Sequence, residues 1–172
     1  MSSEQFPAVA AAYANDAARQ PFNDEYAEFD RSTARDLREV AKCIYGMENT
    51  NLLPPNAQPH FFQVSNGGYD THSDQGAGDA NGQHFGLHAE VAGAVNIFFR
   101  DLADMKPGLE DRVLVVIWSE FSRRIEQNEN GTDHGSQGPM FVVGGAVNGG
   151  VYGNHPNIAE SAWDDQGNTE YR

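Results

Sequence analysis

The sequence RVLVVIW at 112–118 is a continuous, valine-rich apolar run, and it constrains the fold more than any other segment. Such runs are typical of strands buried on both faces, because a half-buried strand alternates apolar and polar residues. Two shorter apolar segments, HFFQV at 60–64 and PMFVVGG at 139–145, predict further strands. Between the first two expected strands, residues 83–105 place apolar side chains on one stripe of a helix.

The order strand, helix, strand over 60–118 predicts a βαβ crossover, so we expect an α/β fold with a mostly parallel sheet. The length favours a single domain over 1–172. We expect it to have a helical N-terminal part at 1–48, a βαβ core with polar loops at 60–145, and a turn-rich tail at 146–172.

Two helices are predicted in the N-terminal part. Residues 7–19 are rich in alanine, which favours helix. Residues 24–46 carry apolar side chains mostly three or four positions apart, which predicts one amphipathic helix. The segment 49–59 contains prolines and asparagines and is expected to be a loop.

The chain is strongly acidic, with a net charge of −14 from 25 acidic and 11 basic residues. This charge repels phosphate backbones and anionic lipid surfaces, so nucleic acids and membranes are disfavoured as partners. Cations are the more natural ligands, although solubility alone also explains such a composition. The single cysteine, Cys43, excludes an internal disulfide. We find no signal peptide and no apolar run approaching the roughly 20 residues of a membrane span.

Long polar loops follow two of the expected strands, at 65–82 and 119–138. Loops of this length are uncommon in compact domains and are usually functional or mobile. In open α/β sheets, ligands bind beyond the carboxyl ends of the strands, where both loops begin. We therefore expect the sheet to bring Asp70 and His72 close to Glu120.

Each of these loops carries residue types that bind metals. Asp70 and His72 are two positions apart, so in extended chain both point the same way. Asp133 and His134 are adjacent between two glycines, and carboxylate and imidazole both suit zinc. Taken singly, each pair is explained equally well by a polar turn, in which Asp70 caps backbone amides and His134 is exposed.

Glu120 directly follows the expected central strand, a usual position for a ligand or a general base. The alternative is a helix cap or an ion pair with Arg123 or Arg124. Together the three clusters supply three carboxylates and two imidazoles, which suits a hydrolytic site with one or two metal ions.

Several motifs in order resemble a known family: GGYDTHSDQ, VLVVIWSEFSRR, NGTDHG and FVVGGAVNGGVYG. Over residues 30–160 the chain is similar to the family catalogued as domain of unknown function 1501, which is grouped with the alkaline phosphatase and sulfatase superfamily. The resemblance implies an alkaline-phosphatase-like α/β/α sandwich. It also implies three groups of metal ligands. The first ligand pair corresponds to Asp70 and His72, the acid at a strand end to Glu120, and the later ligand to His134 with Asp133.

This sequence departs from the superfamily pattern in two places. Better-known relatives have Asp followed by His where this chain has Glu120 and Phe121, which implies that one metal is lost or weakened. The superfamily's nucleophile lies near the first strand of the full domain and has no counterpart here. We therefore expect the chain to be a truncated, C-terminal part of a domain. Members often carry export signals, which implies a periplasmic or secreted parent protein.

The resulting prediction is a metal-dependent hydrolase that acts on a small phosphate or sulfate ester. The predicted metal ligands are Asp70, His72, Glu120, Asp133 and His134. The predicted catalytic residues are Glu120, His134 and Arg123, with Arg123 binding the anion. Zinc is the expected ion, with manganese or calcium as alternatives. Two other hypotheses are a non-catalytic metal-binding or interaction module and a metal-dependent hydrolase of carboxylic esters or amides. For a hydrolase, the sequence leaves open whether activity needs a homo-oligomer or the missing complementary segment of the domain.

Overall fold

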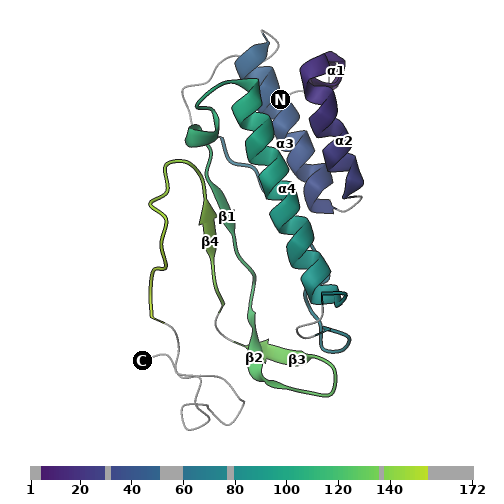
Figure 1. Ribbon diagram of the computed structural model, residues 1–172, viewed down its shortest axis with the longest axis vertical. Helices are drawn as coiled ribbons and strands as arrows, with labels where there is room; N and C mark the ends of the chain where they lie inside the picture. Colours follow the sequence, from purple (N-terminus) through teal and green to yellow (C-terminus); the bar gives the residue numbers. More distant parts are fainter. Residues whose placement is uncertain (1–4, 30–31, 51–59, 77–79, 136–137, 155–172) are drawn as a thin grey trace. The chain divides into compact units, whose positions relative to one another are not determined.

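A computed structural model describes residues 5–29, 32–50, 60–76, 80–135 and 138–154 (Figure 1). The chain divides into two compact units. The first is Met1–Gly67 together with Leu87–Glu110, and the second is Gly68–Gly86 together with Asp111–Arg172. Each unit is described by itself below. The predicted loop at 49–59 and the predicted tail at 146–172 lie largely outside the described residues.

The first unit is a helical bundle. Its helices are α1 (Gln5–Asn15), α2 (Gln20–Glu28), α3 (Ser32–Asn49) and the part of α4 (Gln83–Met105) that follows Gly86; the short 3-10 helix η1 (Ala17–Arg19) joins α1 to α2 (Figure 1). The helix predicted over 24–46 is thus two helices. Its second part begins at Ser32 and Thr33, residue types that favour the start of a helix over its interior.

Apolar side chains at helical spacing form the core of this bundle. Leu37, Ala41 and Ile44 are buried on α3, and Ala94, Phe98 and Leu102 are buried on α4. Gly93 gives the ring of Phe29 room against α4, because a Cβ atom at this position would overlap that ring. The stripe predicted on 83–105 is therefore the face that α4 packs into the bundle.

One polar network lies inside the apolar bundle. The Arg19 guanidinium donates to Asp101 Oδ1 at 2.6 Å and to Asp104, and the Tyr13 hydroxyl donates to Asp101 Oδ2 at 2.6 Å. The Arg19 and Asp101 side chains are only 2% and 0% exposed. A buried ion pair of this kind stabilises a fold only while both partners are present, since either charge alone is costly in an apolar interior.

We predict that Arg19→Met lowers the free energy of unfolding by about 3–5 kcal/mol, because it leaves the Asp101 charge buried without its partner. The measurement is urea unfolding at constant pH. Arg100→Met is the matched control: Arg100 pairs with Glu25 at 2.6 Å on the surface, where such a pair contributes about 0–1 kcal/mol. Equal losses in the two variants would contradict the role given to the buried network.

A second prediction concerns alkaline pH. Burial raises the pKa of Tyr26 and of Tyr13, and the nearby Asp101 charge raises both further. A group with a raised pKa in the folded state contributes its full stability below its unfolded pKa, about 10 for tyrosine, and loses it as the pH rises above that value. We therefore expect unfolding free energy to fall steeply above about pH 10.

Tyrosinate absorbance followed together with urea unfolding checks this expectation. Tyr26→Phe is the informative variant, because the Tyr26 hydroxyl has no hydrogen-bond partner among the described residues. The substitution should leave the unfolding free energy near neutral pH almost unchanged, and it should make the fall in unfolding free energy above about pH 10 smaller. An alkaline profile identical to that of the wild type would show that Tyr26 does not contribute.

The second unit contains two antiparallel strand pairs. β1 (Val115–Ile117) pairs with β4 (Phe141–Val143), with Val116 opposite Val142 (Figure 1). β2 (Ser122–Gln127) pairs with β3 (Thr132–Gly135), with Arg123 opposite His134 and a register irregularity between Arg123 and Gln127. A short 3-10 helix, η2 (Glu110–Arg112), precedes β1.

The chain is a mixed α/β protein as predicted, but the described strands do not form the expected parallel sheet. Both pairings are antiparallel, and residues 60–64 have no regular secondary structure. An apolar run becomes a strand only where a neighbouring strand pairs with its backbone groups, and no described strand pairs with this segment. Phe61 is accordingly 90% exposed. Among the described strands β1 has one partner, and Val116 is 45% exposed, so the expected burial on both faces is not reached there.

The long polar segment 119–138 is also more regular than predicted. Most of it is the β2–β3 hairpin, closed by a turn in which Asn128 Oδ1 accepts from the Gly131 amide at 3.0 Å. Asparagine and glycine are the residue types that such turns favour, so the signal for this hairpin was present in the sequence.

Candidate metal centre

The β2–β3 hairpin and the loop that follows Gly68 lie against each other within the second unit. The Gln75 amide donates to the Asn130 carbonyl at 3.0 Å, and the Thr132 hydroxyl donates to Gln75 Oε1 at 2.8 Å. The Thr132 amide also donates to the Thr71 carbonyl at 3.4 Å, and Thr71 is 3% exposed. These contacts fix the loop that carries Asp70 and His72 beside the strand that carries His134.

Gly131 permits this close approach. A Cβ atom at Gly131 would overlap the Thr71 carbonyl oxygen and the main-chain carbonyl of His72. Both overlapped groups are main-chain carbonyls of the loop, so a side chain at position 131 can be accommodated only if the loop moves.

We predict that Gly131→Ala lowers the free energy of unfolding of the second unit by about 1–3 kcal/mol, the usual range for overpacking a well-packed site. It should also move the amide resonances of residues 70–75. Gly149→Ala is the control, because nothing lies within 4 Å of a Cβ atom built there. Unchanged spectra for the loop in the Gly131 variant would show that the contact does not hold it.

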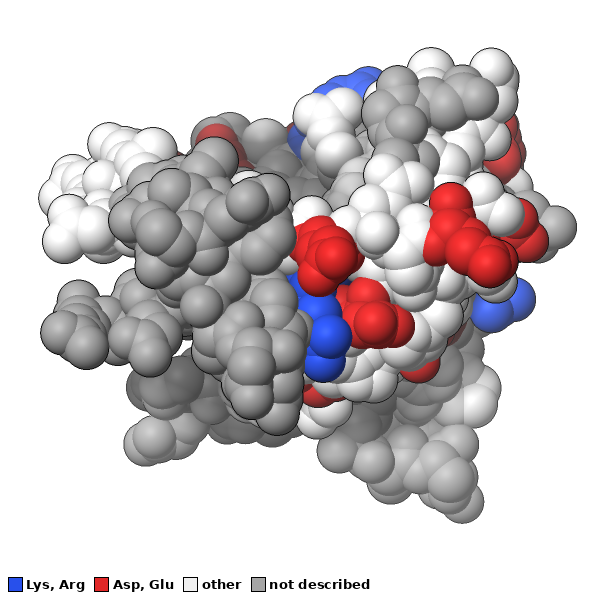
Figure 2. Space-filling model, turned by 90° about the horizontal axis from the view of Figure 1, so that it is seen from below, with Lys and Arg blue, Asp and Glu red and all other residues white. Residues whose placement is uncertain are grey.

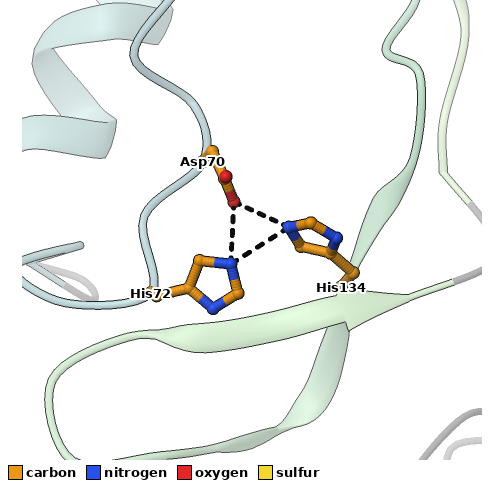
Figure 3. Close-up of side chains that lie close together, drawn as sticks. All are labelled: Asp70, His72 and His134. Carbon is orange, nitrogen blue, oxygen red and sulfur yellow. Dashed lines mark hydrogen bonds and ion pairs between the residues drawn. The ribbon is translucent and has the colours of Figure 1, made fainter.

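Three ligand atoms converge where the loop meets the hairpin (Figure 3). Asp70 Oδ1 lies 3.0 Å from His72 Nε2 and 2.8 Å from His134 Nε2, and the two nitrogens are 3.0 Å apart. Zinc holds such ligands at about 2.0–2.1 Å, which in a tetrahedron separates them by about 3.3 Å. The observed triangle is a few tenths of an ångström tighter, so the donors fit a small divalent cation.

Asp133 orients one of these histidines. Its Oδ1 lies 3.2 Å from His72 Nδ1, and since a carboxylate only accepts, Nδ1 carries the proton. The Nε2 lone pair of a neutral His72 then faces Asp70 and His134, the arrangement found behind metal-binding histidines. Hydrogen bonding to His72 holds the pKa of Asp133 below its usual range, with smaller contributions from Arg124 and Asn128.

Arg123 braces the carboxylate of the triangle. Its Nη1 donates to Asp70 Oδ1 at 2.7 Å, its Nε donates to Thr132 Oγ1 at 3.1 Å, and its Nη2 donates to the Thr132 carbonyl. Hydrogen bonds from His134 and then from Arg123 hold the pKa of Asp70 below its usual range. Arg124 is further out: its Nε donates to the His134 carbonyl at 3.1 Å, and its Nη1 is 3.9 Å from Asp133 Oδ2.

The structure therefore brings four of the five predicted ligands together and not the fifth. Asp70, His72 and His134 supply the converging atoms, and Asp133 supports His72 from behind. Glu120 is outside this group among the described residues, and its carboxylate accepts from Ser119 Oγ at 3.1 Å. Its part as a ligand or general base stays a prediction. So does anion binding by Arg123, whose guanidinium already has three partners.

Sequence reasoning missed the residues that hold the cluster in place. Thr132 and Gln75 connect the hairpin to the loop, and Phe121 lies flat on the His134 ring. Only the Asn130-Gly131 turn signal could have indicated the hairpin in advance.

The cluster is open to solvent, and the chain as a whole is acidic. The side chains of Asp70, His72, Asp133 and His134 are each about half exposed. On the face drawn in Figure 2, Asp and Glu side chains cover more of the described surface than Lys and Arg do, in keeping with the net charge of −14. Such a surface raises the local concentration of cations.

The described residues define a mixed α/β protein with an exposed cluster of two histidines and one carboxylate that could hold a metal ion. The family described as "Protein of unknown function (DUF1501)" matches residues 11–170, and the chain belongs to this family. No curated protein and no solved structure matches the chain. None of the described helices is long and apolar enough to cross a membrane.

Proposed function

We propose that the chain is a metal-dependent hydrolase of phosphate or sulfate esters, built around Asp70, His72 and His134. The observation that carries the proposal is the convergence of one carboxylate oxygen and two imidazole nitrogens within 3.0 Å of one another. With the proton of a neutral His72 on Nδ1, its Nε2 lone pair and the Asp70 oxygen face each other at 3.0 Å with no proton between them, and a cation would fill that place.

The donor set favours zinc over the alternatives. Two imidazoles and one carboxylate suit zinc, or manganese in an octahedral site, whereas calcium prefers oxygen ligands alone. Three protein ligands leave room for a substrate or water, as in catalytic rather than structural zinc sites. A divalent cation bound there would polarise an ester oxygen and acidify a water molecule.

The chain's own residues have distinct parts in this proposal. Asp133 sets the tautomer of His72, and Arg123 holds the Asp70 carboxylate in place. The formal charges of Asp70 and Asp133 are balanced by Arg123 and Arg124, so a dication would make the site locally positive. A positive site within an acidic chain favours a small anionic ester over a large polyanion.

An alkaline-phosphatase-like α/β/α core belongs to the same proposal. Its support is the order of the motifs in a member of this family, and the antiparallel strand pairs of the described residues add none. Glu120 remains the proposed general base or additional ligand, and Arg123 or its neighbour Arg124 the proposed contact to the anion. We assign no nucleophilic side chain.

A non-catalytic metal-binding module is the second candidate. It is favoured by the commitment of Arg123 to Thr132 and Asp70, which leaves this guanidinium little capacity to bind substrate. A hydrolase of carboxylic esters or amides would use the same cluster.

The test begins with elemental analysis of the purified chain. We expect about one zinc ion per chain in the wild type and a loss of most of it in His72→Ala/His134→Ala, since three ligands are the usual number for an open site. The matched control is His84→Ala/His88→Ala, two histidines of α4 at four-residue spacing. Unchanged metal content in the first double variant would exclude the site.

Turnover separates the candidate functions. Metal-loaded chain is assayed with p-nitrophenyl phosphate, p-nitrophenyl sulfate and p-nitrophenyl acetate, with and without chelator. Chelator-sensitive release from the phosphate or the sulfate supports the proposal, and release from the acetate alone supports the carboxylic-ester alternative. Bound zinc without turnover of any of the three favours the non-catalytic module.

A further inference from the structure

The two histidines of the cluster are held by different means. His72 is oriented by the Asp133 carboxylate at its Nδ1. His134 Nδ1 has no such hydrogen-bond partner among the described residues. Instead, the ring of Phe121 lies against the imidazole of His134, with ring centroids 3.8 Å apart and an angle of 21° between the planes. This stacking is closer than the usual 4.5–7 Å of aromatic pairs.

The sequence places this ring in a suitable position. Phe121 immediately precedes β2, and Ser122, the next residue, is opposite Gly135 in the hairpin. His134 is therefore a near neighbour across the strand pair. Gly135 adds to the closeness, because a Cβ atom there would come within 3.0 Å of Arg123 O and Ser122 Oγ. The hairpin brings the two rings together without any contribution from the loop at 68–76.

We propose that Phe121 is a positioning residue that fixes the ring of His134 so that Nε2 faces Asp70 and His72. This inference rests on the cation site proposed above. The final torsion of a histidine side chain is broad and roughly two-fold, so an imidazole that is 48% exposed would otherwise turn away for part of the time. A flat contact over one ring face restricts that torsion without adding a charge or a ligand atom.

The Asp133 contact to His72 and the Phe121 contact to His134 should affect cation binding in different ways. Asp133 acts on His72 through a charge-assisted hydrogen bond, which also makes the imidazole a stronger donor to a metal. Phe121 acts on His134 by shape alone. Removing the ring should therefore weaken cation binding through orientation, and another flat ring should restore it.

The test compares Phe121→Leu, which keeps an apolar side chain but removes the ring, with Phe121→Tyr, which keeps the ring and adds a hydroxyl. The first readout uses metal-free protein labelled with ¹³C-histidine. We expect ring protons of His134 to be shifted upfield by the Phe121 ring in the wild type and in Phe121→Tyr. The nuclear Overhauser effect between the His134 and His72 rings, whose centroids are 4.8 Å apart, reports the orientation: it should be strong in these two proteins and lost in Phe121→Leu. The ring protons of His72 should hold their positions in all three proteins, which a general loss of structure would not allow.

The second readout is zinc affinity, measured by competition with a chromogenic chelator. We expect Kd to rise about tenfold in Phe121→Leu, at the lower end of the range for residues that support metal ligands, and to stay near the wild-type value in Phe121→Tyr. Equal affinity in all three proteins, or ordinary His134 shifts in the wild type, would overturn the inference.

The two readouts also keep this inference apart from the proposed function. If the wild type binds no zinc, the proposed cation site fails. The nuclear Overhauser effect between the His134 and His72 rings then still decides whether Phe121 holds the ring: its loss in Phe121→Leu alone supports the positioning role, and equal effects in all three proteins refute it.

Discussion

One main-chain contact makes the cluster possible. The ligand atoms come from two segments about sixty residues apart, and they meet because Gly131 lets the hairpin turn lie directly on the carbonyls of Thr71 and His72. Backbone hydrogen bonds on either side of this contact then fix the register between loop and hairpin. The geometry of the cluster is thus set by the backbone, and the side chains of Asp70 and His134 need only reach across a short gap.

The two units use charge in opposite ways. In the helical bundle, Arg19 and Asp101 are buried, so their pairing decides whether the bundle tolerates either charge. Around the cluster the Asp70 and Asp133 carboxylates are about half exposed, so water and salt screen their pairs with Arg123 and Arg124 more than the buried pair. Stability alone therefore gives little reason for Asp70 and its neighbours to lie together, in keeping with the cation site proposed above.

The sequence predicted local features better than pairing. The helical stripe at 83–105, the strand around Val115 and the family all agree with the structure or the comparison. The parallel sheet was wrong for the described strands, because periodicity shows what a segment can bury but not which segment covers it. Asp70, His72, Asp133 and His134 were predicted as ligands from residue type and position. Their side chains lie together, through a hairpin rather than along a sheet edge, and metal binding by them stays a prediction. Phe121 could not be recognised as a support, because its contact to His134 exists only once β2 and β3 are paired.

The β1–β4 pair has a practical consequence. Val116, Trp118, Met140 and Phe141 are at least 45% exposed, and the two strands carry no charged residue. What keeps separate molecules from associating through these strands is then the electrostatic repulsion between their acidic groups. Buffers near the isoelectric point of about 4.6, or concentrated salt, remove that repulsion while these strands stay uncovered. Under such conditions the strand edges would join neighbouring molecules into precipitate.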